Sequence, residues 1–336
     1  GKSHHHGPPV VPAHGVLDPS VIAEGLRPHL VDRIGDRLRP APESTRARID
    51  VQVARSPFFC SGCPHNSSTV VPDGAVVGAG IGCHTMVMLG EPGRGGDIVG
   101  VTAMGNEGSQ WVGMESFIEA DHLIQNLGDG TYFHSGQLAI TSAINAGSHI
   151  TFKLLYNSAV SMTGGQTPSG QLDPQTVAAV MLAQGVARVI VTSDDPDRRT
   201  GWPAGVDVWH RRRLVEAQEV LAATPGVTVL IHDQACAAEL RRDRKRGRVV
   251  TPAERVVIDH RICEGCGDCG EVSNCLSVQA VDTEFGRKTR IDQTTCNLDM
   301  SCVDGDCPSF VVVNTGPSMV ARALSWLFDR RRTQAR

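Results

Sequence analysis

The segment Leu123–Gly136 reads LIQNLGDGTYFHSG. An apolar run of strand type ends there at Gly128-Asp129-Gly130, and a helical pattern follows. Asn157 is separated from this triplet by 26 residues and stands at the end of the next apolar run, in LLYNSAVSMTGGQ. Glycines let a backbone approach a diphosphate, and a carboxylate and an amide oxygen at neighbouring strand ends can share one Mg²⁺. The pattern predicts a diphosphate and magnesium site, although a GDG triplet alone also suits an ordinary turn.

Around this segment, from about Ala75 to Ile231, apolar runs alternate with helical patterns. Such alternation predicts an α/β fold with a mostly parallel sheet that is covered on both faces. A separate short helix is expected near Pro19–Leu30. The expected strands are Ala75–Ile81, Ile98–Ala103, Leu123–Leu127, Ile150–Leu155, Arg188–Thr192 and Val227–Ile231, and the expected helices are Gly136–Asn145, Pro174–Gly185 and His210–Ala223.

Eleven cysteines are the second informative feature, and seven of them lie between residues 252 and 315. That stretch is too poor in long apolar runs to build much core, so bound metal should help to hold it. Its first run is Cys263-x2-Cys266-x2-Cys269-x5-Cys275. Three cysteines at successive x2 spacing are typical of a [4Fe–4S] ferredoxin site whose fourth cysteine serves the other cluster, whereas zinc sites use pairs.

The second run of cysteines reads Cys296-x5-Cys302-x4-Cys307-Pro308, with Asp299 where a middle cysteine would stand. Asp299 is either a weak, hard fourth ligand or an ordinary surface aspartate. An Asp-ligated [4Fe–4S] cluster and an open [3Fe–4S] cluster are both compatible with this run. Crossing of the ligands predicts two sites, one from Cys263, Cys266, Cys269 and Cys307 and one from Cys275, Cys296 and Cys302.

The four remaining cysteines are Cys60 and Cys63, in CSGCPH, and the single Cys83 and Cys236. A C-x2-C pair and two distant cysteines near strand ends can converge on one further cluster. Cys236 has a buried, inert thiol as its alternative. The neighbouring His65 and His84 can either hydrogen-bond a diphosphate or simply pack in the interior.

Four quoted segments, FFCSGCPHNSST, NLGDGTYFHSG, YNSAVSMTGGQ and CEGCGDC, resemble the 2-oxoacid:ferredoxin oxidoreductase family, and in particular its indolepyruvate type. The resemblance covers about residues 10 to 315. It implies that Cys60, Cys63, Cys83 and Cys236 hold a cluster beside thiamine diphosphate. It also implies a Mg²⁺ held by Asp129, Asn157 and the carbonyl of Ala159, with Thr163, Gly164, Gly165 and Gln166 close by.

The activity implied by this resemblance is oxidative decarboxylation of an aryl 2-oxoacid. Electrons would pass through the iron–sulfur clusters to ferredoxin, and coenzyme A would take the acyl group. Arg198, Arg199 and Arg211–Arg213 either attract the phosphates of coenzyme A or form a solvated face. The family order is a pyrimidine-binding domain, this domain, the clusters and a gamma-type domain. We expect this chain to hold only the middle part, in a dimer with the other domains or subunits, so no catalytic residue is assigned.

The expected domain organisation is an N-terminal segment (1–56), a thiamine-diphosphate-binding domain (57–240), a basic linker (241–251), a ferredoxin-like module (252–315) and a tail (316–336) forming a short amphipathic helix. The basic stretch Arg241–Arg248 is either an extended, solvated linker or a docking patch for a partner domain.

The net charge of −4 argues against a protein that coats nucleic acid, and no apolar run is long enough to span a membrane. Without a signal pattern we expect the cytoplasm, where cysteines are more often metal ligands than disulfides. Two other functions remain open: a non-catalytic fragment or electron-transfer subunit, and a zinc-dependent nucleic-acid-binding protein. The latter does not explain the GDG-x26-N pattern.

The cysteine pattern makes a prediction about metal content. If all eleven cysteines ligate clusters, protein purified without oxygen should be brown and carry about eleven or twelve irons. Metal analysis and visible absorption measure this. Stoichiometric zinc in a colourless protein would contradict it.

Overall fold

The computed structural model describes residues 11, 18–34, 37, 56–90 and 93–316, which fall into two compact units, Gly1–Arg55 and Ser56–Arg336. In the first unit, helix α1 (Pro19–Ile34) confirms the helix expected near Pro19–Leu30. The helix expected in the C-terminal tail lies outside the described residues. Within the described ranges, no helix is both long and apolar enough to cross a membrane.

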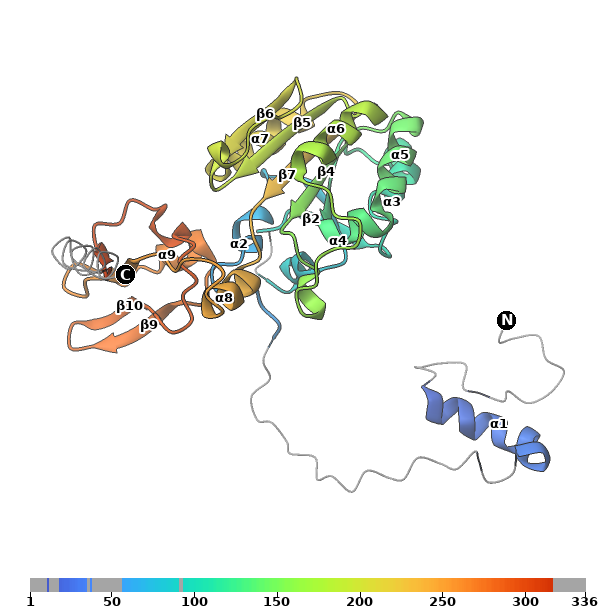
Figure 1. The fold of residues 1–336 in the computed structure, drawn as a ribbon, viewed down its shortest axis with the longest axis horizontal. Helices are drawn as coiled ribbons and strands as arrows, with labels where there is room; N and C mark the ends of the chain where they lie inside the picture. Colours follow the sequence, from blue (N-terminus) through green and yellow to red (C-terminus); the bar gives the residue numbers. More distant parts are fainter. Residues whose placement is uncertain (1–10, 12–17, 35–36, 38–55, 91–92, 317–336) are drawn as a thin grey trace, which may run out of the picture. The chain divides into compact units, whose positions relative to one another are not determined.

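The second unit is built on a seven-stranded sheet of order β2-β1-β3-β4-β7-β5-β6, in which every neighbouring pair is parallel (Figure 1). All six strands expected from the sequence are present, so the mostly parallel α/β fold is confirmed. The strands are β1 (Val76–Ala79), β2 (Asp97–Val101), β3 (Leu123–Gly128), β4 (Ile150–Tyr156), β5 (Arg188–Ser193), β6 (Val206–His210) and β7 (Val227–Asp233).

Alternate residues of each strand point to opposite faces of the sheet. Both faces carry apolar side chains, so helices cover both. Val189 and Val191 of β5 belong to one buried cluster with Met181, whereas Ile190 between them packs with Leu214 in another. The helices in the described part of this unit are α2 (His65–Ser68), α3 (Ser109–Met114), α4 (Asp129–Thr131), α5 (Gln137–Ala146), α6 (Pro174–Gln184), α7 (Leu214–Ala222), α8 (Ala237–Lys245) and α9 (Asp268–Ser273).

The edge strand β6 is a difference from the sequence-based expectation. It pairs only with β5, and its residues are half-buried, so it lacks the continuous apolar run of a central strand. The helix expected from His210 is therefore wrong at its start. His210 ends the strand, and its Nδ1 accepts from the backbone N–H of Arg212 at 3.2 Å. Helix α7 begins only at Leu214.

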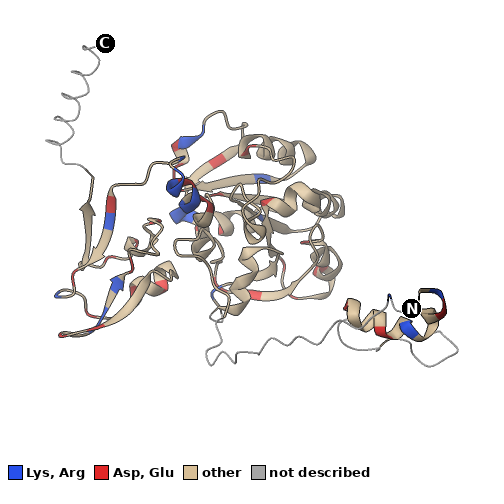
Figure 2. Cartoon of the chain, turned by 60° about the horizontal axis from the view of Figure 1, so that its bottom comes forward, with Lys and Arg blue, Asp and Glu red and all other residues tan. Residues whose placement is uncertain are grey.

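The basic stretch Arg241–Arg248 is a second difference. Its first half is helical, within α8, so an extended linker is wrong there (Figures 1 and 2). Arg241 donates from Nη1 to the carbonyl of Thr295 at 3.0 Å, and Arg244 donates to the carbonyl of Asn297 at 2.8 Å. These basic side chains therefore hold a later segment of the same chain.

The region after α8 contains two small antiparallel sheets, one of β8 (Glu254–Ile258) with β11 (Phe310–Asn314) and one of β9 (Val278–Thr283) with β10 (Gly286–Ile291). Among its described residues, the buried hydrophobic side chains are Val256, Cys263 and Ile291. The thin core expected from the sequence is confirmed.

Lys153 is an unexpected ionisable residue in the centre of the sheet. It is fully buried in β4, and its Nζ donates to Oε1 of Gln218 at 2.9 Å. Burial lowers the pKa of the Lys153 ammonium from 10.5 to about 7. The folded chain therefore releases this proton at a lower pH than the unfolded chain.

This pKa difference predicts a pH dependence of stability. Between pH 7 and 10.5 the unfolded state holds more protons, so this group makes the free energy of unfolding rise with pH, by up to about 1.4 kcal/mol per unit. Lys153→Met should remove that slope, so the stability of the variant relative to wild type should be greatest near pH 7 and should decline as pH rises. Urea unfolding at several pH values measures it, and parallel profiles would contradict it.

Candidate functional site

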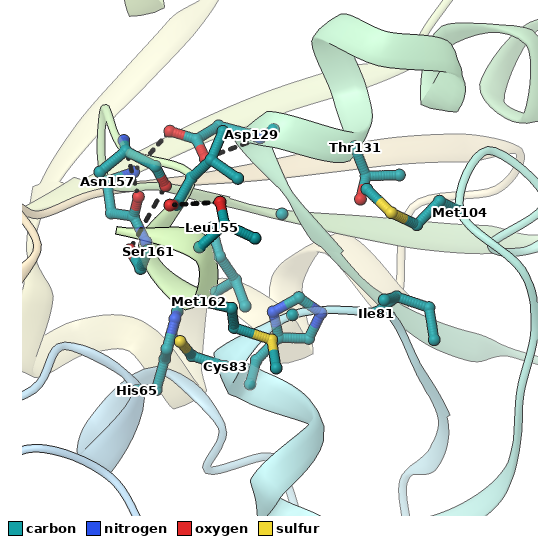
Figure 3. Close-up of a pocket in the computed structure, with 17 residues that line it drawn as sticks. His65, Ile81, Cys83, Met104, Asp129, Thr131, Leu155, Asn157, Ser161 and Met162 are labelled. Carbon is teal, nitrogen blue, oxygen red and sulfur yellow. Dashed lines mark hydrogen bonds between the residues drawn. The ribbon is translucent and has the colours of Figure 1, made fainter. Parts of the chain in front are cut away.

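The centre of the site is the buried carboxylate of Asp129, directly after β3. Its Oδ2 accepts from the backbone N–H of Asn157 at 3.0 Å, and its Oδ1 accepts from that of Gly130 at 2.8 Å (Figure 3). Oδ2 also accepts from the backbone N–H of Ser158 at 2.7 Å. The amide oxygen of Asn157 accepts from the N–H of Ala159 at 3.0 Å. The strand ends of β3 and β4 thus bring Asp129 and Asn157 together, as the sequence predicts.

The TGGQ segment forms a loop that folds back on the end of β4. The backbone N–H of Gly165 donates to the carbonyl of Val160 at 3.0 Å. The backbone N–H of Val160 donates to the carbonyl of Gln166 at 2.8 Å. Gly164 and Gly165 have φ of 119° and 79°, a region that favours glycine. The Thr163 hydroxyl donates to Oε1 of Gln166 at 2.8 Å.

A cavity of about 240 Å³ opens between these strand ends and the segment around Cys83 (Figure 3). Gly164, Gly165 and Gln166 adjoin it through their loop but do not line it. Nine of the residues singled out from the sequence line it, namely His65, Cys83, His84, Gly128, Asp129, Gly130, Asn157, Ala159 and Thr163.

Burial sets the charge state of this cavity. It raises the pKa of Asp129 to about 6, against the opposing effect of the backbone N–H groups. Burial, followed by the influence of neighbouring basic side chains, lowers the pKa values of His65 and His84 to about 3. Both imidazoles are neutral at pH 7, and Nε2 of His84 has no hydrogen-bond partner among the described residues.

The residues present fit thiamine diphosphate with Mg²⁺. The carboxylate of Asp129, the amide oxygen of Asn157 and the carbonyl of Ala159 are hard oxygen donors, the type that Mg²⁺ prefers. Gly128 and Gly130 leave the cavity wall without side chains, and the unpaired Nε2 of His84 is a polar group with capacity for one more hydrogen bond.

The four cysteines outside residues 252–315 lie close to one another in the structure. Burial raises the pKa values of the Cys60, Cys63 and Cys83 thiols, and neighbouring thiols of the same group, including Cys236, raise them further. The value for Cys83 is about 11. The backbone N–H of Cys236 donates to the carbonyl of Asn157 at 3.4 Å, so this cysteine lies next to one of the predicted Mg²⁺ ligands.

The seven other cysteines fall into two overlapping neighbourhoods. Burial raises the pKa of Cys302 to about 12, and Cys275 and Cys296 contribute to the shift. A cavity of about 360 Å³ is lined by Cys263, Cys266, Cys269, Cys302 and Cys307. In the described part of the chain, no three His, Cys, Asp or Glu side chains are arranged to hold a single metal ion. The cluster ligand sets stay predictions.

Asp299 also stays a prediction as a ligand, and its surroundings are now defined. Its Oδ1 accepts from Nη1 of Arg211 at 2.7 Å and from Nε2 of Gln234 at 2.8 Å. Asp299 is close enough to Cys296 to raise the pKa of that thiol, after burial and Cys275.

Sequence analysis did not single out two buried polar residues near the cavity. Glu107 is fully buried, accepts from the backbone N–H of Gly105 at 2.6 Å, and leaves Oε1 without a partner in the described chain. His232, in β7, lies close enough to His65 to lower its pKa. The GNEG stretch around Glu107 was a signal that could have found it; His232 has none, because it lies in an otherwise apolar strand.

Comparison with known proteins first gives the class of the domain. Residues 80–198 match the family model "Thiamine pyrophosphate enzyme, C-terminal TPP binding domain". The match contains Asp129, Asn157 and the TGGQ loop, so this part of the α/β unit is similar to a thiamine-pyrophosphate-binding domain.

Two individual proteins are similar in sequence over a longer part of the chain than the family model. The chain is 28% identical over 252 residues to indolepyruvate oxidoreductase subunit IorA of Archaeoglobus fulgidus, and 28% identical over 268 residues to the subunit of the same name from Thermococcus kodakarensis. These alignments cover 72% of this chain but only 37% and 38% of the relatives' lengths. The resemblance to the indolepyruvate ferredoxin oxidoreductase family is therefore confirmed.

Among solved structures, a 2-oxoglutarate:ferredoxin oxidoreductase from Magnetococcus marinus matches with a TM-score of 0.42 and 17% identity, covering 55% of this chain and 66% of that one.

The geometry around Asp129 predicts the effect of removing its carboxylate. Asp129→Ala should weaken binding of Mg²⁺ with thiamine diphosphate by at least about 10–100-fold, since even outer partners of a metal site have effects of that size. In wild type the affinity should also fall below pH 6, where the carboxyl group becomes protonated. Calorimetry, with the partner domain added if required, measures both.

Asp197→Ala is the matched control, because Asp197 is an exposed carboxylate in the turn after β5. The control should bind like wild type. Equal affinity in Asp129→Ala would mean that the GDG triplet is only a turn.

Proposed function

We propose that this chain is the diphosphate-binding and electron-transferring part of a 2-oxoacid:ferredoxin oxidoreductase of the indolepyruvate type. The observation that carries the proposal is the shared cavity at the carboxyl ends of β3 and β4. Asp129 and Asn157, Mg²⁺-type ligands, line the same cavity as Cys83 of the four-cysteine group. A cofactor held there would be next to its electron acceptor.

In this proposal the chain's residues bind and orient the cofactor. Asp129, Asn157 and the carbonyl of Ala159 hold Mg²⁺, while Gly128 and Gly130 admit the diphosphate. Thr163 of the TGGQ loop and His65, neutral at pH 7, contribute polar groups at the cavity wall. When bound, thiamine diphosphate supplies the carbanion chemistry that decarboxylation of a 2-oxoacid requires.

The cysteines hold the clusters in the same proposal. Cys60, Cys63, Cys83 and Cys236 would carry the cluster beside the thiamine. A cluster of iron and sulfide is wider than a single ion, so its thiolates need not meet at one point. The ferredoxin-like module would hold one cluster on Cys263, Cys266, Cys269 and Cys307 and the other on Cys275, Cys296 and Cys302, whose fourth position is next to Asp299.

The complete reaction would need partners. We propose that pyrimidine-binding and gamma-type domains, coenzyme A and an external ferredoxin complete it in the cytoplasm, with an aryl 2-oxoacid as substrate and a dimeric enzyme. The second candidate is an electron-transfer subunit that needs a separate pyrimidine-domain partner. The two alignments quoted above cover 37% and 38% of the relatives' lengths, and this second candidate matches that partial coverage.

The test of this proposal is reconstitution. The family's active site lies between a diphosphate domain and a pyrimidine domain, and proton transfer by a positioned group is commonly worth about 10²–10⁴ in rate. The isolated chain should not reduce a viologen dye with indolepyruvate and coenzyme A, although its clusters should be reducible chemically. Adding the pyrimidine-domain polypeptide should restore turnover. Rapid oxidation by the chain alone would contradict the division of roles.

A further inference from the structure

Asp299 lies in a loop whose backbone is unusual on both sides of it. Leu298 and Met300 have φ of 60° and 66°, in the left-handed region that is unfavourable for residues other than glycine. Such conformations persist when surrounding contacts hold them, and they often occur at functional sites. The position of Asp299 therefore requires an energetically unfavourable backbone conformation at both neighbouring residues.

The contacts of Asp299 reach from the small module to the seven-stranded domain. Arg211 binds it at two points, donating from Nη1 to the carboxylate Oδ1 and from Nη2 to the backbone carbonyl, each at 2.7 Å. The two side chains are 12% and 10% exposed, so this ion pair is largely shielded from water. A shielded, two-point arginine contact is directional as well as attractive.

Gln234 supplies a second anchor and connects Asp299 with the interior. Its Nε2 donates to Oδ1 of Asp299 at 2.8 Å, and its Oε1 lies 3.2 Å from Nε2 of His232. The other ring nitrogen of His232 lies 3.0 Å from the hydroxyl of Thr192. Arg211 follows β6 and Gln234 follows β7, so Asp299 sits against the ends of two strands.

The same loop also touches the segment between Cys60 and Cys63. A side chain at Gly62 would come within 2.9 Å of Cβ of Asp299, and Gly62 has a φ of 63°. Nδ2 of Asn297 donates to the carbonyl of Ser61 at 2.7 Å. The backbone N–H of Gly62 donates to Sγ of Cys275 at 3.3 Å. One proposed cluster loop thus hydrogen-bonds a cysteine of another.

We propose that Asp299 is a positioning residue, which latches the ferredoxin-like module onto the thiamine-binding domain and so fixes the contact between Gly62 and Cys275. We call the contacts of Asp299 with Arg211 and Gln234 the Asp299 latch. Only the role of the latch in electron transfer rests on the proposed function. In that function, one electron would leave a reduced cluster held by the Cys60 group and reduce an oxidised cluster held by the Cys275 group, with no atom transferred.

The chain contains a matched control for this latch. Arg212 and Asp304 form a second ion pair between the same two regions, one residue along from Arg211, but their side chains are 64% and 27% exposed. Exposed pairs contribute little to stability, whereas breaking a shielded pair leaves an uncompensated charge. Asp304→Asn should therefore leave the contact intact, and Asp299→Asn and Arg211→Gln should both loosen it.

Hydrogen–deuterium exchange of the full chain measures the latch directly. In Asp299→Asn and in Arg211→Gln, amide exchange over residues 60–63 and 296–300 should become at least about tenfold faster, while Asp304→Asn should change it by less than about twofold. The double variant should exchange little faster than either single variant. Wild-type exchange in both single variants, or equal acceleration in Asp304→Asn, would overturn the proposal.

Spectroscopy separates the latch from ligation of iron by Asp299. As a latch, Asp299→Asn and Arg211→Gln should slow electron transfer between the two clusters alike, with iron content and paramagnetic resonance spectra unchanged. A loss of iron or a new cluster spectrum in Asp299→Asn alone would assign it as a ligand and overturn the positioning role. The exchange measurement needs neither thiamine nor turnover, so a failure of the proposed function would be recognised separately.

Discussion

The arrangement of the site depends on one buried carboxylate. Asp129 follows β3 directly and binds the first two backbone N–H groups beyond β4. These bonds fix the ends of two central strands relative to each other, so the oxygens of Asp129 and Asn157 face the same cavity. The hydrogen bonds favour the ionised carboxyl group, whereas burial disfavours it, and burial is the larger effect. A bound divalent cation would reverse that balance and keep the carboxylate charged.

The surroundings of this cavity contain an unusual number of buried basic side chains. His65, His84 and His232 are buried, and burial together with Lys153 lowers the pKa of each ring. These three histidines and Lys153 are therefore four neighbouring basic groups that do not carry four positive charges at neutral pH. Neutral imidazoles can donate and accept hydrogen bonds, which suits a layer that supports cofactors without adding an unpaired charge.

The small module has too few buried apolar side chains to be held to the larger domain by hydrophobic contact alone. Its loops are held instead by directional polar contacts from α8, from Arg211 and from Gln234. Such contacts specify one relative geometry, because an arginine fork and a carboxylate match in few orientations. The basic stretch that looks like a solvated linker in the sequence is part of this arrangement.

The sequence by itself determined the elements whose signals are local. Apolar runs identified six of the seven strands of the sheet, and the GDG-x26-N spacing identified the pair at the strand ends, because parallel strands place their carboxyl ends at one edge. Tertiary structure decided what depends on residues distant in the chain. The edge strand β6, the burial of Lys153 and His232, and the partners of Asp299 follow from which surfaces meet, and no periodicity in the sequence encodes that. Asp299 shows the difference most clearly: its position in the cysteine run suggested a ligand, while Arg211 and Gln234, 88 and 65 residues earlier, determine what its carboxylate touches.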